Sequence, residues 1–362
     1  MKILHVITSL YTGGAERLMV DLLPQLRNKD DNQVDLLLIN GVETPFKEKL
    51  IQAGINVYEL SMTNDVYNAR NILRFRRFFK NTDYDIIHTH NTACQLFVPL
   101  SRVLMGKTGT KLVTTEHSTN NRRRLKWWLK PIDKWMYKKY AAIVCIAPQA
   151  QRNLESYIGK KDGVCTISNG VDTKRFIRPI KDISGQQRFV VTMVAALRVE
   201  KDHATLLKAM TRLPEQYSLQ IVGGGPKEVV ASVKAMCSEL GLDERVSFLG
   251  VRMDVPDIME QSDVIVLSSH WEGLSLSSIE GMASGRPFIA SDVEGLRDTV
   301  SGAGLLFPHG DDAALAQAIQ DLCDNPAYYR QIATACQERA KQYDISLMAE
   351  GYNNLYRSLS NG

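Results

Sequence analysis

Short apolar runs and stretches with helical spacing alternate along the whole chain. The runs are rich in Val, Ile and Leu. They lie at 3–8, 34–39, 85–88, 111–115 and 142–146 in the first half, and at 189–195, 218–222, 246–249, 264–267 and 287–290 in the second. Stretches such as 16–26, 203–210 and 228–240 repeat apolar residues as one face of a helix does. This alternation is typical of βαβ units and predicts an α/β protein with parallel sheets.

The pattern is interrupted near the middle of the chain. Residues 169–188 are rich in charge, Gly and Pro and keep no periodicity, so we interpret them as an interdomain linker or hinge. The linker separates an expected N-terminal Rossmann-like domain, 1–168, from a second one, 189–343. Residues 344–362 are predicted to form a final helix that packs back toward the first domain. Ligands of doubly wound sheets bind beyond the carboxyl ends of the strands, so two such domains predict a deep cleft between them.

The composition fits a globular protein with two cores. Of the 362 residues, 44% are hydrophobic and 23% are charged. We find no run of about 18 apolar residues that could cross a membrane, and we interpret the short apolar start as a buried strand rather than a signal peptide. The six cysteines are far apart and form no CxxC pair, which argues against a zinc ribbon or a disulfide framework. We therefore expect a cytoplasmic protein.

Charge is distributed unevenly between the two halves. Residues 1–170 contain 25 Lys and Arg against 15 Asp and Glu, whereas the remainder contains 19 against 25. A basic domain indicates an anionic partner, and nucleic acid, phospholipid head groups or a lipid-linked pyrophosphate would all fit. Two stretches, from Arg74 to Lys80 and from Arg122 to Lys130, combine cations with aromatic rings, which suits a membrane interface unless the rings pack on the core. We expect peripheral contact with the inner face of the cytoplasmic membrane and no nucleic acid.

The segment 264–290 reads as strand, loop, helix, turn and strand, and it carries two glutamates. Glu272 precedes a flexible loop, and Glu280 follows eight residues later on a helix that begins near Ser277. A loop that enters a helix presents unpaired N–H groups to a diphosphate, and carboxylates beside it accept hydrogen bonds from sugar and ribose hydroxyls. The alternative is a helix with exposed acids.

Three further groups of residues stand at expected strand ends. Arg198 and Lys201, three residues apart, can turn two cations toward one anion, although they could also be solvated surface charges. His117 follows a predicted strand, where a structural hydrogen-bonded histidine is the alternative, and its neighbour Glu116 should face the other way. His88 and His90 could be two metal ligands, but the sequence shows no third ligand at a recognised spacing from them, so we expect no metal.

Several of these segments resemble the retaining glycosyltransferases of family 4, also called glycosyl transferases group 1, which have the GT-B fold. The resemblance rests on the E-x7-E spacing followed by GMASGRPFIASDVEGLRDTV, and on AALRVEKDHATLLKAM, IVGGGP, FLGVRMDVPDIM, ISNGVDTKRF and SLYTGGAER. It covers nearly the whole chain and is densest in 190–300. The chain resembles in particular the bacterial members that build surface polysaccharides.

The resemblance implies a role for each matched position. The catalytic set would be Arg198, Lys201, Glu272 and His117. The donor would be bound by Gly13, Gly14, Arg198, Lys201, Val251, Arg252, Glu272, Gly273, Leu274, Ser275, Leu276 and Glu280. The sugar or acceptor cleft would contain His90, Asn91, Glu116 and His117. The two cations would hold the leaving diphosphate, Glu280 the ribose and Glu272 the transferred sugar. The family implies a nucleotide-sugar donor, with a UDP-sugar favoured, a glycan or lipid-linked acceptor, and no required cofactor.

Two positions depart from the family pattern, and two other functions compete with transfer. Ser168 stands where Pro is usual, and Gly281 stands where Ala is common, which weakens the expected helix slightly. A GT-B sugar-nucleotide 2-epimerase would need dedicated acid and base residues in the cleft. A non-catalytic basic module that binds lipid or nucleic acid would not need to keep Arg198, Lys201, Glu272 and Glu280.

Overall fold

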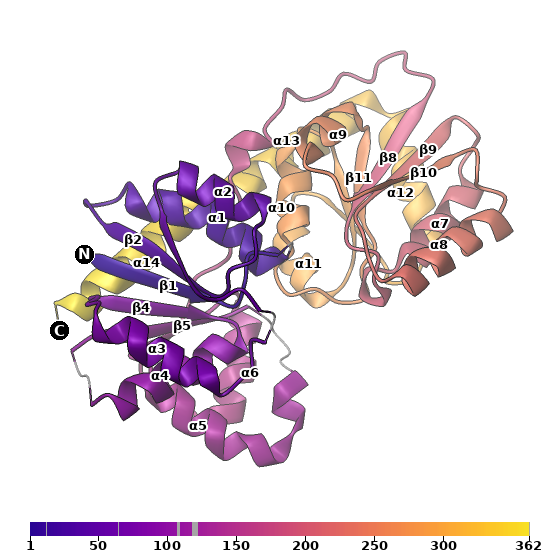
Figure 1. Ribbon diagram of the computed structural model, residues 1–362. Coiled ribbons are helices and arrows are strands. Elements are labelled where there is room, and N and C mark those ends of the chain that lie inside the picture. Colours follow the sequence, from indigo (N-terminus) through magenta and orange to yellow (C-terminus); the bar gives the residue numbers. More distant parts are fainter. Residues whose placement is uncertain (12, 64, 107–108, 118–121, 362) are drawn as a thin grey trace. The chain divides into compact units, whose positions relative to one another are not determined.

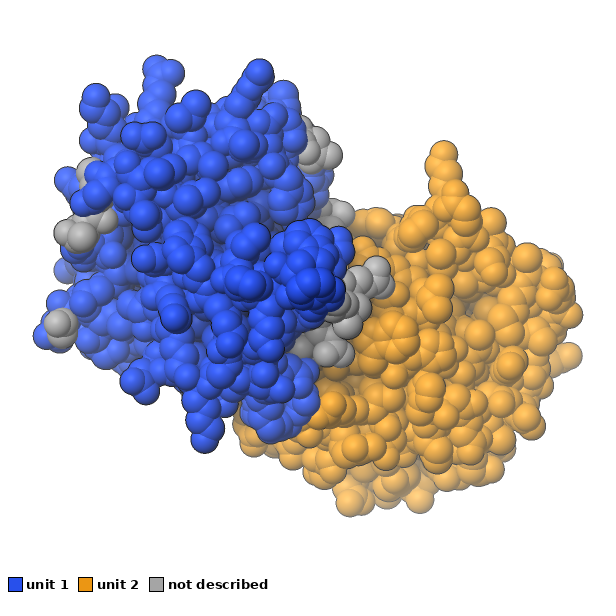
Figure 2. All heavy atoms as spheres, turned by 90° about the horizontal axis from the view of Figure 1, so that it is seen from below, with its two compact units in different colours: residues 1–170, 345–362 blue, residues 171–344 orange. Residues whose placement is uncertain are grey.

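The computed structural model describes residues 1–362 except 12, 64, 107–108, 118–121 and 362. The chain forms two compact units, coloured separately in Figure 2. Unit 1 comprises Met1–Gly170 together with Ile345–Gly362, and unit 2 comprises Val171–Asp344. Each unit is built on one parallel sheet, as the alternation of the sequence predicts.

Unit 1 contains a seven-stranded parallel sheet in the order β3-β2-β1-β4-β5-β6-β7. Its strands are β1 (Lys2–Ile7), β2 (Gln33–Asn40), β3 (Asn56–Ser61), β4 (Ile86–His90), β5 (Lys111–Glu116), β6 (Ala142–Cys145) and β7 (Val164–Thr166). Its helices are α1 (Gly14–Arg27), α2 (Pro45–Gln52), α3 (Arg70–Lys80), α4 (Thr92–Leu104), α5 (Lys130–Lys138), α6 (Pro148–Ile158) and α14 (Ile345–Ser360), and short 3-10 turns lie at Arg122–Leu125 and Trp127–Leu129.

The central strands of unit 1 are buried on both faces, which explains why strands such as β1 have apolar side chains on both sides. Side chains alternate along β1, so Ile3 and Ile7 pack with α1 and α14 on one face, whereas Leu4 and Val6 pack with α3 and α4 on the other. Figure 1 shows α14, in yellow, on the same side of this sheet as α1. Tyr352 of α14 is fully buried there. The last helix of the chain is therefore part of the core of unit 1.

Unit 2 contains a six-stranded parallel sheet in the order β10-β9-β8-β11-β12-β13. Its strands are β8 (Phe189–Val194), β9 (Tyr217–Val222), β10 (Val246–Gly250), β11 (Val264–Leu267), β12 (Phe288–Ser291) and β13 (Leu305–Phe307). Its helices are α7 (His203–Arg212), α8 (Lys227–Glu239), α9 (Val255–Gln261), α10 (Leu276–Ala283), α11 (Glu294–Val300), α12 (Asp312–Asp324) and α13 (Pro326–Lys341). One continuous apolar core joins them.

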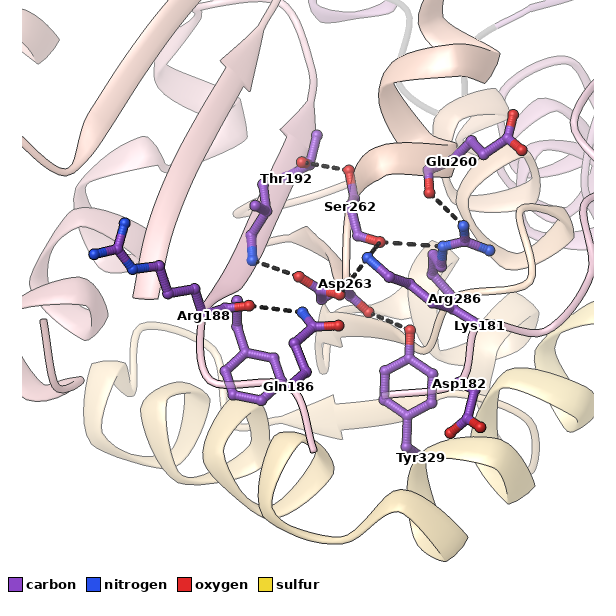
Figure 3. Close-up of polar contacts among 12 residues, drawn as sticks. Lys181, Asp182, Gln186, Arg188, Thr192, Glu260, Ser262, Asp263, Arg286 and Tyr329 are labelled. Carbon is purple, nitrogen blue, oxygen red and sulfur yellow. Dashed lines mark hydrogen bonds and ion pairs between the residues drawn. The ribbon is translucent and has the colours of Figure 1, made fainter. Parts of the chain in front are cut away.

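Residues 171–188, which the sequence analysis assigns to a linker, lie within unit 2. Phe176 and Ile183 of this segment are buried in its core. Figure 3 shows the polar network beside it at the amino ends of β8 and β11. There Lys181 pairs with Asp263 at 2.6 Å, and Arg286 donates to the carbonyl of Ser262 at 3.1 Å. Arg286 also donates to the carbonyl of Pro179, at 3.0 Å. These contacts anchor the segment at the end of the sheet where β8 and β11 begin, opposite the carboxyl ends of the strands.

Among the described residues, no helix combines the length and apolar character needed to span a bilayer.

Candidate active site

The strand order of unit 2 creates a switch point between β8 and β11. From β8 the sheet continues to β9 and β10 on one side, and from β11 to β12 and β13 on the other. The loops that leave the carboxyl ends of β8 and β11 therefore diverge, and ligands of open α/β sheets bind in the crevice between such loops. The first loop carries Arg198 and Lys201, and the second carries Glu272.

These two loops are bonded to each other at several points. The amide of His270 donates to the carbonyl of Glu200 at 2.9 Å, and Ser268 Oγ donates to the carbonyl of Asp202 at 2.8 Å. Lys201 Nζ forms an ion pair with Glu272 Oε1, and their side chains are only 19% and 11% exposed. The structure thus brings together a cation and an acid that are 71 residues apart in the chain.

Arg198 does not join this pair. Its side chain is 62% exposed and lies 3.8 Å from Glu200 Oε1. Its backbone begins a short 3-10 turn, Val199–Lys201, which leads into α7 through Asp202 in the left-handed region, at φ 47°. The turn fixes the backbone of Arg198, while the guanidinium lies in solvent. A side chain that is so exposed can change rotamer.

The N-terminus of α10 begins at the second loop. Ser275 occupies the N-cap position, but its side chain does not cap the helix and instead lies 3.1 Å from Ser277 Oγ. Uncapped first-turn amides and the positive end of the helix dipole favour an anionic ligand. Glu280, one turn further along α10, is buried. A side chain at Gly295 would approach the carbonyl oxygen of Gly273 to 1.9 Å, so close packing of α11 depends on this glycine.

A glycine-rich turn follows β9. Gly223 has φ +146°, and a Cβ there would lie 2.0 Å from the carbonyl oxygen of Ala195, so only glycine fits. A Cβ on Gly224 would lie 2.8 Å from Val251 Cγ2. Val251 is 66% exposed, and Arg252 pairs with Asp254 at 2.8 Å. The backbone of the turn, which carries no side chains at its glycines, lies beside the exposed side chain of Val251. Together they form a surface suited to a planar base.

Unit 1 has its own switch point, between β1 and β4. Asn91, after β4, donates to Thr8 Oγ1, after β1, at 2.9 Å. Gly13 is the N-cap of α1, and a Cβ there would lie 2.2 Å from Glu16 Oε2, whereas a Cβ on Gly14 would meet nothing within 4 Å. Burial is the main cause that raises the pKa of Glu16. The expected Gly-Gly loop therefore stands at the start of a helix, with a carboxylate folded against it.

His117 lies directly after β5 and contacts another histidine. Its Nε2 lies 2.9 Å from His90 Nδ1. Burial lowers the pKa of His117 to about 4, so its imidazole is neutral at pH 7. His117 can therefore exchange a hydrogen bond with a hydroxyl, but it cannot act there as a cation.

Glu116 faces away from His117, as alternation along a strand requires. The carboxylate is buried and accepts from Gln95 at 2.8 Å and from Tyr137 at 2.6 Å, and it pairs with Arg124 at 2.9 Å. These partners occupy both of its oxygens. Both oxygens of Glu116 are thus bonded within unit 1, and the cleft contact expected from the sequence stays a prediction.

The sequence analysis considered His88 and His90 but missed His5, which lies with them, and it missed the cluster of Asp202, His270 and His309. His5 of β1 is in register with His88 of β4, so His5, His88 and His90 have ring nitrogens within 4.8 Å of one another. A single histidine within an apolar strand was the only available signal. In unit 2, His270 Nδ1 lies 2.6 Å from His309 Nε2 and 3.6 Å from Asp202 Oδ2.

The two basic-aromatic stretches differ in what they expose. In α3, Phe75 and Phe79 are buried in the core. In the second stretch, Trp127 is 83% exposed and Trp128 is 55% exposed, with Lys126 Nζ 5.8 Å from the Trp128 ring. Exposed indoles beside cations form an amphipathic surface, so the second stretch is the better candidate for a membrane contact.

Comparison with known proteins agrees with this architecture. Residues 12–175 match the family described as "Glycosyltransferase Family 4", and residues 188–325 match the one described as "Glycosyl transferases group 1". A UDP-Gal:alpha-D-GlcNAc-diphosphoundecaprenol alpha-1,3-galactosyltransferase of Escherichia coli is 26% identical over 82% of this chain and 80% of its own. A phosphatidyl-myo-inositol mannosyltransferase of Mycobacterium leprae is 26% identical over 96% and 94%.

A solved structure shares the whole fold. Anabaena HepE, crystallised with UDP and glucose, matches at a TM-score of 0.84 and 22% identity over 99% of this chain and 100% of its own. The GT-B fold predicted from the sequence is thus confirmed. The switch-point loops, the two parallel sheets and the two family matches lead to one conclusion: the chain belongs to the family 4 glycosyltransferases, and it is a retaining hexosyltransferase.

Proposed function

We propose that this enzyme transfers a sugar from a UDP-sugar to a lipid-linked acceptor during synthesis of a cell-surface polysaccharide. The observation that carries the proposal is the meeting of Lys201 and Glu272 at the switch point of unit 2, beside the uncapped start of α10. Relatives support the choice of ligands, since the galactosyltransferase named above uses UDP-Gal and a diphosphoundecaprenol acceptor. HepE binds UDP and, in a second structure, UDP-glucose.

In this proposal the donor lies across the strand ends of unit 2. The base rests on the glycine-rich turn and Val251, with Arg252 adjacent. Glu280 accepts hydrogen bonds from the ribose hydroxyls. The loop from Gly273 to Leu276 donates its amides to the diphosphate, Lys201 binds the same group, and Arg198 turns inward from its exposed position. Glu272 accepts from the hydroxyls of the transferred sugar.

The reaction forms the bond between the acceptor oxygen and the anomeric carbon on the face that the diphosphate leaves. The bond from that carbon to the phosphate oxygen breaks, and the acceptor proton passes to the leaving diphosphate. Negative charge therefore grows on the diphosphate, where Lys201, Arg198 and the α10 amides stabilise it. Loss of one preorganised donor at such a charge costs roughly 3–4 kcal/mol of barrier. No divalent cation is invoked in this scheme.

Unit 1 contributes the acceptor side. We assign sugar or acceptor binding to His117 and Asn91, at the strand ends of unit 1, where His90 contacts His117. We assign a role in diphosphate binding to the backbone of Gly13 and Gly14, at the start of α1. The net positive charge of this half suits an acceptor that carries a pyrophosphate.

Binding of nucleotide sugars tests the donor assignment. A panel of UDP-, GDP- and ADP-sugars is screened by thermal shift, because a ligand at about 100 times its Kd stabilises the folded state by about 2.7 kcal/mol. We expect UDP-sugars to raise the melting temperature, Lys201→Ala to abolish the rise, and Lys208→Ala, an exposed lysine on α7, to retain it. The proposal fails if no nucleotide sugar stabilises the wild type. Consumption of the donor without acceptor, with inversion at C2, would instead identify an epimerase.

A second part of the proposal places the protein in the cytoplasm, peripheral on the inner face of the cytoplasmic membrane. Trp127 and Trp128 would lie at head-group depth, with Lys126 and Lys130 toward lipid phosphate. In flotation with phosphatidylglycerol vesicles, we expect the double variant Trp127→Ala, Trp128→Ala to stay at the bottom of the gradient. Trp271→Ala, which removes a 59% exposed indole from unit 2, is the matched control and should float. Absence of wild-type protein from the vesicle fraction would refute this part.

A further inference from the structure

A chain of hydrogen bonds leads from His117 into the core of unit 1. His117 Nε2 lies 2.9 Å from His90 Nδ1, and His90 Nε2 lies 2.9 Å from His5 Nδ1. His5 Nε2 in turn lies 3.5 Å from the hydroxyl of Tyr356. His5, His90 and Tyr356 are fully buried.

The chain continues from Tyr356 to its inner end. The Tyr356 hydroxyl lies 2.5 Å from His88 Nδ1, and His88 Nε2 lies 2.7 Å from Thr115 Oγ1. Thr115 Oγ1 lies 2.9 Å from the hydroxyl of Tyr352. Tyr352 and Tyr356 both come from α14, one turn apart, so the last helix supplies two of the seven members.

All members of the chain are neutral at pH 7. Burial lowers the pKa of His5 to about 3 and holds those of His88 and His90 well below the ordinary value. Burial also raises the pKa values of the two tyrosines on α14. A neutral imidazole has one N–H donor and one acceptor nitrogen, and a hydroxyl has one hydrogen to donate. An imidazole that accepts on one side must therefore donate on the other, and a buried hydroxyl that accepted on both sides would leave its own hydrogen without a partner, so the chain has a single direction.

Tyr352 decides that direction. Within the described part of the chain, Thr115 Oγ1 is the hydrogen-bond partner that the structure gives the Tyr352 hydroxyl. The phenolic hydrogen is buried, so it must be donated to Thr115 or remain without a partner among the described residues. Thr115 then donates to His88 Nε2. In the reverse direction this buried donor would have no acceptor, which is unfavourable. The population of the stated direction should therefore exceed that of the reverse by at least about fivefold.

The same rule sets the donor and acceptor of every following hydrogen bond, from His88 to His117. His88 Nδ1–H donates to Tyr356, Tyr356 donates to His5 Nε2, His5 Nδ1–H donates to His90 Nε2, and His90 Nδ1–H donates to His117 Nε2. His117 Nε2 is therefore an acceptor, and its single proton must be on Nδ1. A tyrosine that accepted from both neighbours would strand its own hydrogen in the core.

We propose that Tyr352 and Tyr356 are positioning residues that fix the tautomer of His117, so that it presents Nδ1–H as an obligate hydrogen-bond donor. For the transfer reaction, which rests on the proposed function above, the group that receives this hydrogen bond is an oxygen of the sugar or of the acceptor. The proposal concerns a neutral donor and not an acid, because His117 has no second proton to give.

The three inner histidines are better explained by this chain than by a metal ion. His5, His88 and His90 have nitrogens close enough to hold a metal. All six of their ring nitrogens, however, already contact a neighbour in the chain. A metal could bind only by displacing several of these bonds, since a ligand nitrogen must offer a lone pair.

Nitrogen spectroscopy tests the tautomer directly. In the full-length protein labelled with 15N-histidine, long-range 1H–15N spectra distinguish a protonated ring nitrogen from an unprotonated one. Single His variants assign the seven histidines. We expect His117 with a protonated Nδ1 and an unprotonated Nε2. A protonated Nε2, or equal populations of both forms, would overturn the proposal. So would stoichiometric zinc binding that shifts His5, His88 and His90 in a protein prepared without chelator. The measurement needs no substrate, so failure of the proposed function leaves it intact.

Variants test the role of the tyrosines. Tyr356→Phe cuts the chain, so we expect the His117 signals to move toward a mixture of tautomers. The matched control is Tyr84→Phe, which removes another buried hydroxyl of unit 1, bonded to Asp35 at 2.8 Å and outside the chain. It should leave the His117 tautomer unchanged. An unchanged tautomer in Tyr356→Phe as well would refute the role assigned to that residue.

Turnover provides a second readout. Asn at position 117 can place its amide nitrogen where Nδ1 lies, whereas Gln places it near the Nε2 position. We expect His117→Asn to retain at least tenfold more kcat than His117→Gln, with KM for the donor less affected. An equal mixture of tautomers halves the competent fraction, so Tyr356→Phe should lower turnover about twofold. Better turnover by His117→Gln would contradict a donor at Nδ1.

Discussion

Neutralising Glu272 should change nucleotide binding and sugar transfer in opposite directions. In the structure the Glu272 carboxylate contacts the Lys201 ammonium, so a diphosphate must compete with this carboxylate for the cation. Glu272→Gln keeps the shape of the side chain and removes its charge. UDP lacks the sugar that Glu272 is proposed to bind, so UDP gains the freed ammonium and loses nothing. UDP-sugar turnover should fall, because the proposed contact to the sugar hydroxyls weakens.

The structure sets the size of the effect. With side chains 19% and 11% exposed, the pair is too buried to behave as a surface ion pair. A hydrogen bond to a charged group contributes about 1.5–3 kcal/mol net. If UDP recovers about 1 kcal/mol of this, its Kd should fall about fivefold. Removal of the cation in Lys201→Met should raise the Kd for UDP by about tenfold or more.

Isothermal titration with UDP measures both variants, and the double variant completes a thermodynamic cycle for the pair. Glu239→Gln, an exposed glutamate at the end of α8, is the control and should bind UDP as the wild type does. The reasoning is refuted if Glu272→Gln weakens UDP binding tenfold while the fold is intact, since Glu272 would then assist the diphosphate rather than compete with it.

Three further outcomes concern stability. In Gly281→Ala the new Cβ would lie 2.7 Å from the buried Phe288 ring, so an overpacking cost of about 1–3 kcal/mol should outweigh the gain in helix propensity of about 1 kcal/mol; urea unfolding would show no stabilisation. Arg286→Met strands several buried carbonyls and should cost at least about 3 kcal/mol, seen as a lower melting temperature of unit 2, whereas a melt equal to wild type would contradict the anchoring role. Burial lowers the pKa values of His5 to about 3 and His117 to about 4, so the unfolded chain binds more protons between pH 6.5 and 4; the free energy of unfolding should therefore fall across that window as pH is lowered, and a flat profile would contradict neutral histidines.

The sequence was sufficient for the fold but not for the edges of the sheets. Central strands such as β11 are apolar throughout, and their runs were predicted within about two residues of the observed bounds. The edge strand β3 mixes half-buried and exposed residues, so it produced no apolar run and was not predicted. The strands β7 and β13 were missed because three residues are too few to show a periodicity, although β13 is apolar throughout.

The sequence predicted which residues belong to the candidate site, but not which of them contact one another. The motif spacing selected Lys201 and Glu272, but their contact depends on which loops flank the switch point, and that follows from strand order. The contacts of Glu116 could not be predicted, because its partners Gln95 and Tyr137 come from two different helices. His5 carried no motif, since its importance arises from register with β4. The interpretation of Gly281 as a weakness of the helix also changes, because the structure places it against Phe288.

The placement of α14 in unit 1 has a consequence for biosynthesis. Unit 2 is inserted between two parts of unit 1, so during translation most of unit 1 leaves the ribosome before the helix that completes it. Until residues 345–360 are made, the buried face that receives Tyr352 and Tyr356 is open to water, and His88 lacks the hydroxyl that its Nδ1 contacts. A nascent chain that stops after unit 2 would therefore carry a finished unit 2 joined to an unfinished unit 1, and the proposed ordering of His117 would require residues 345–360.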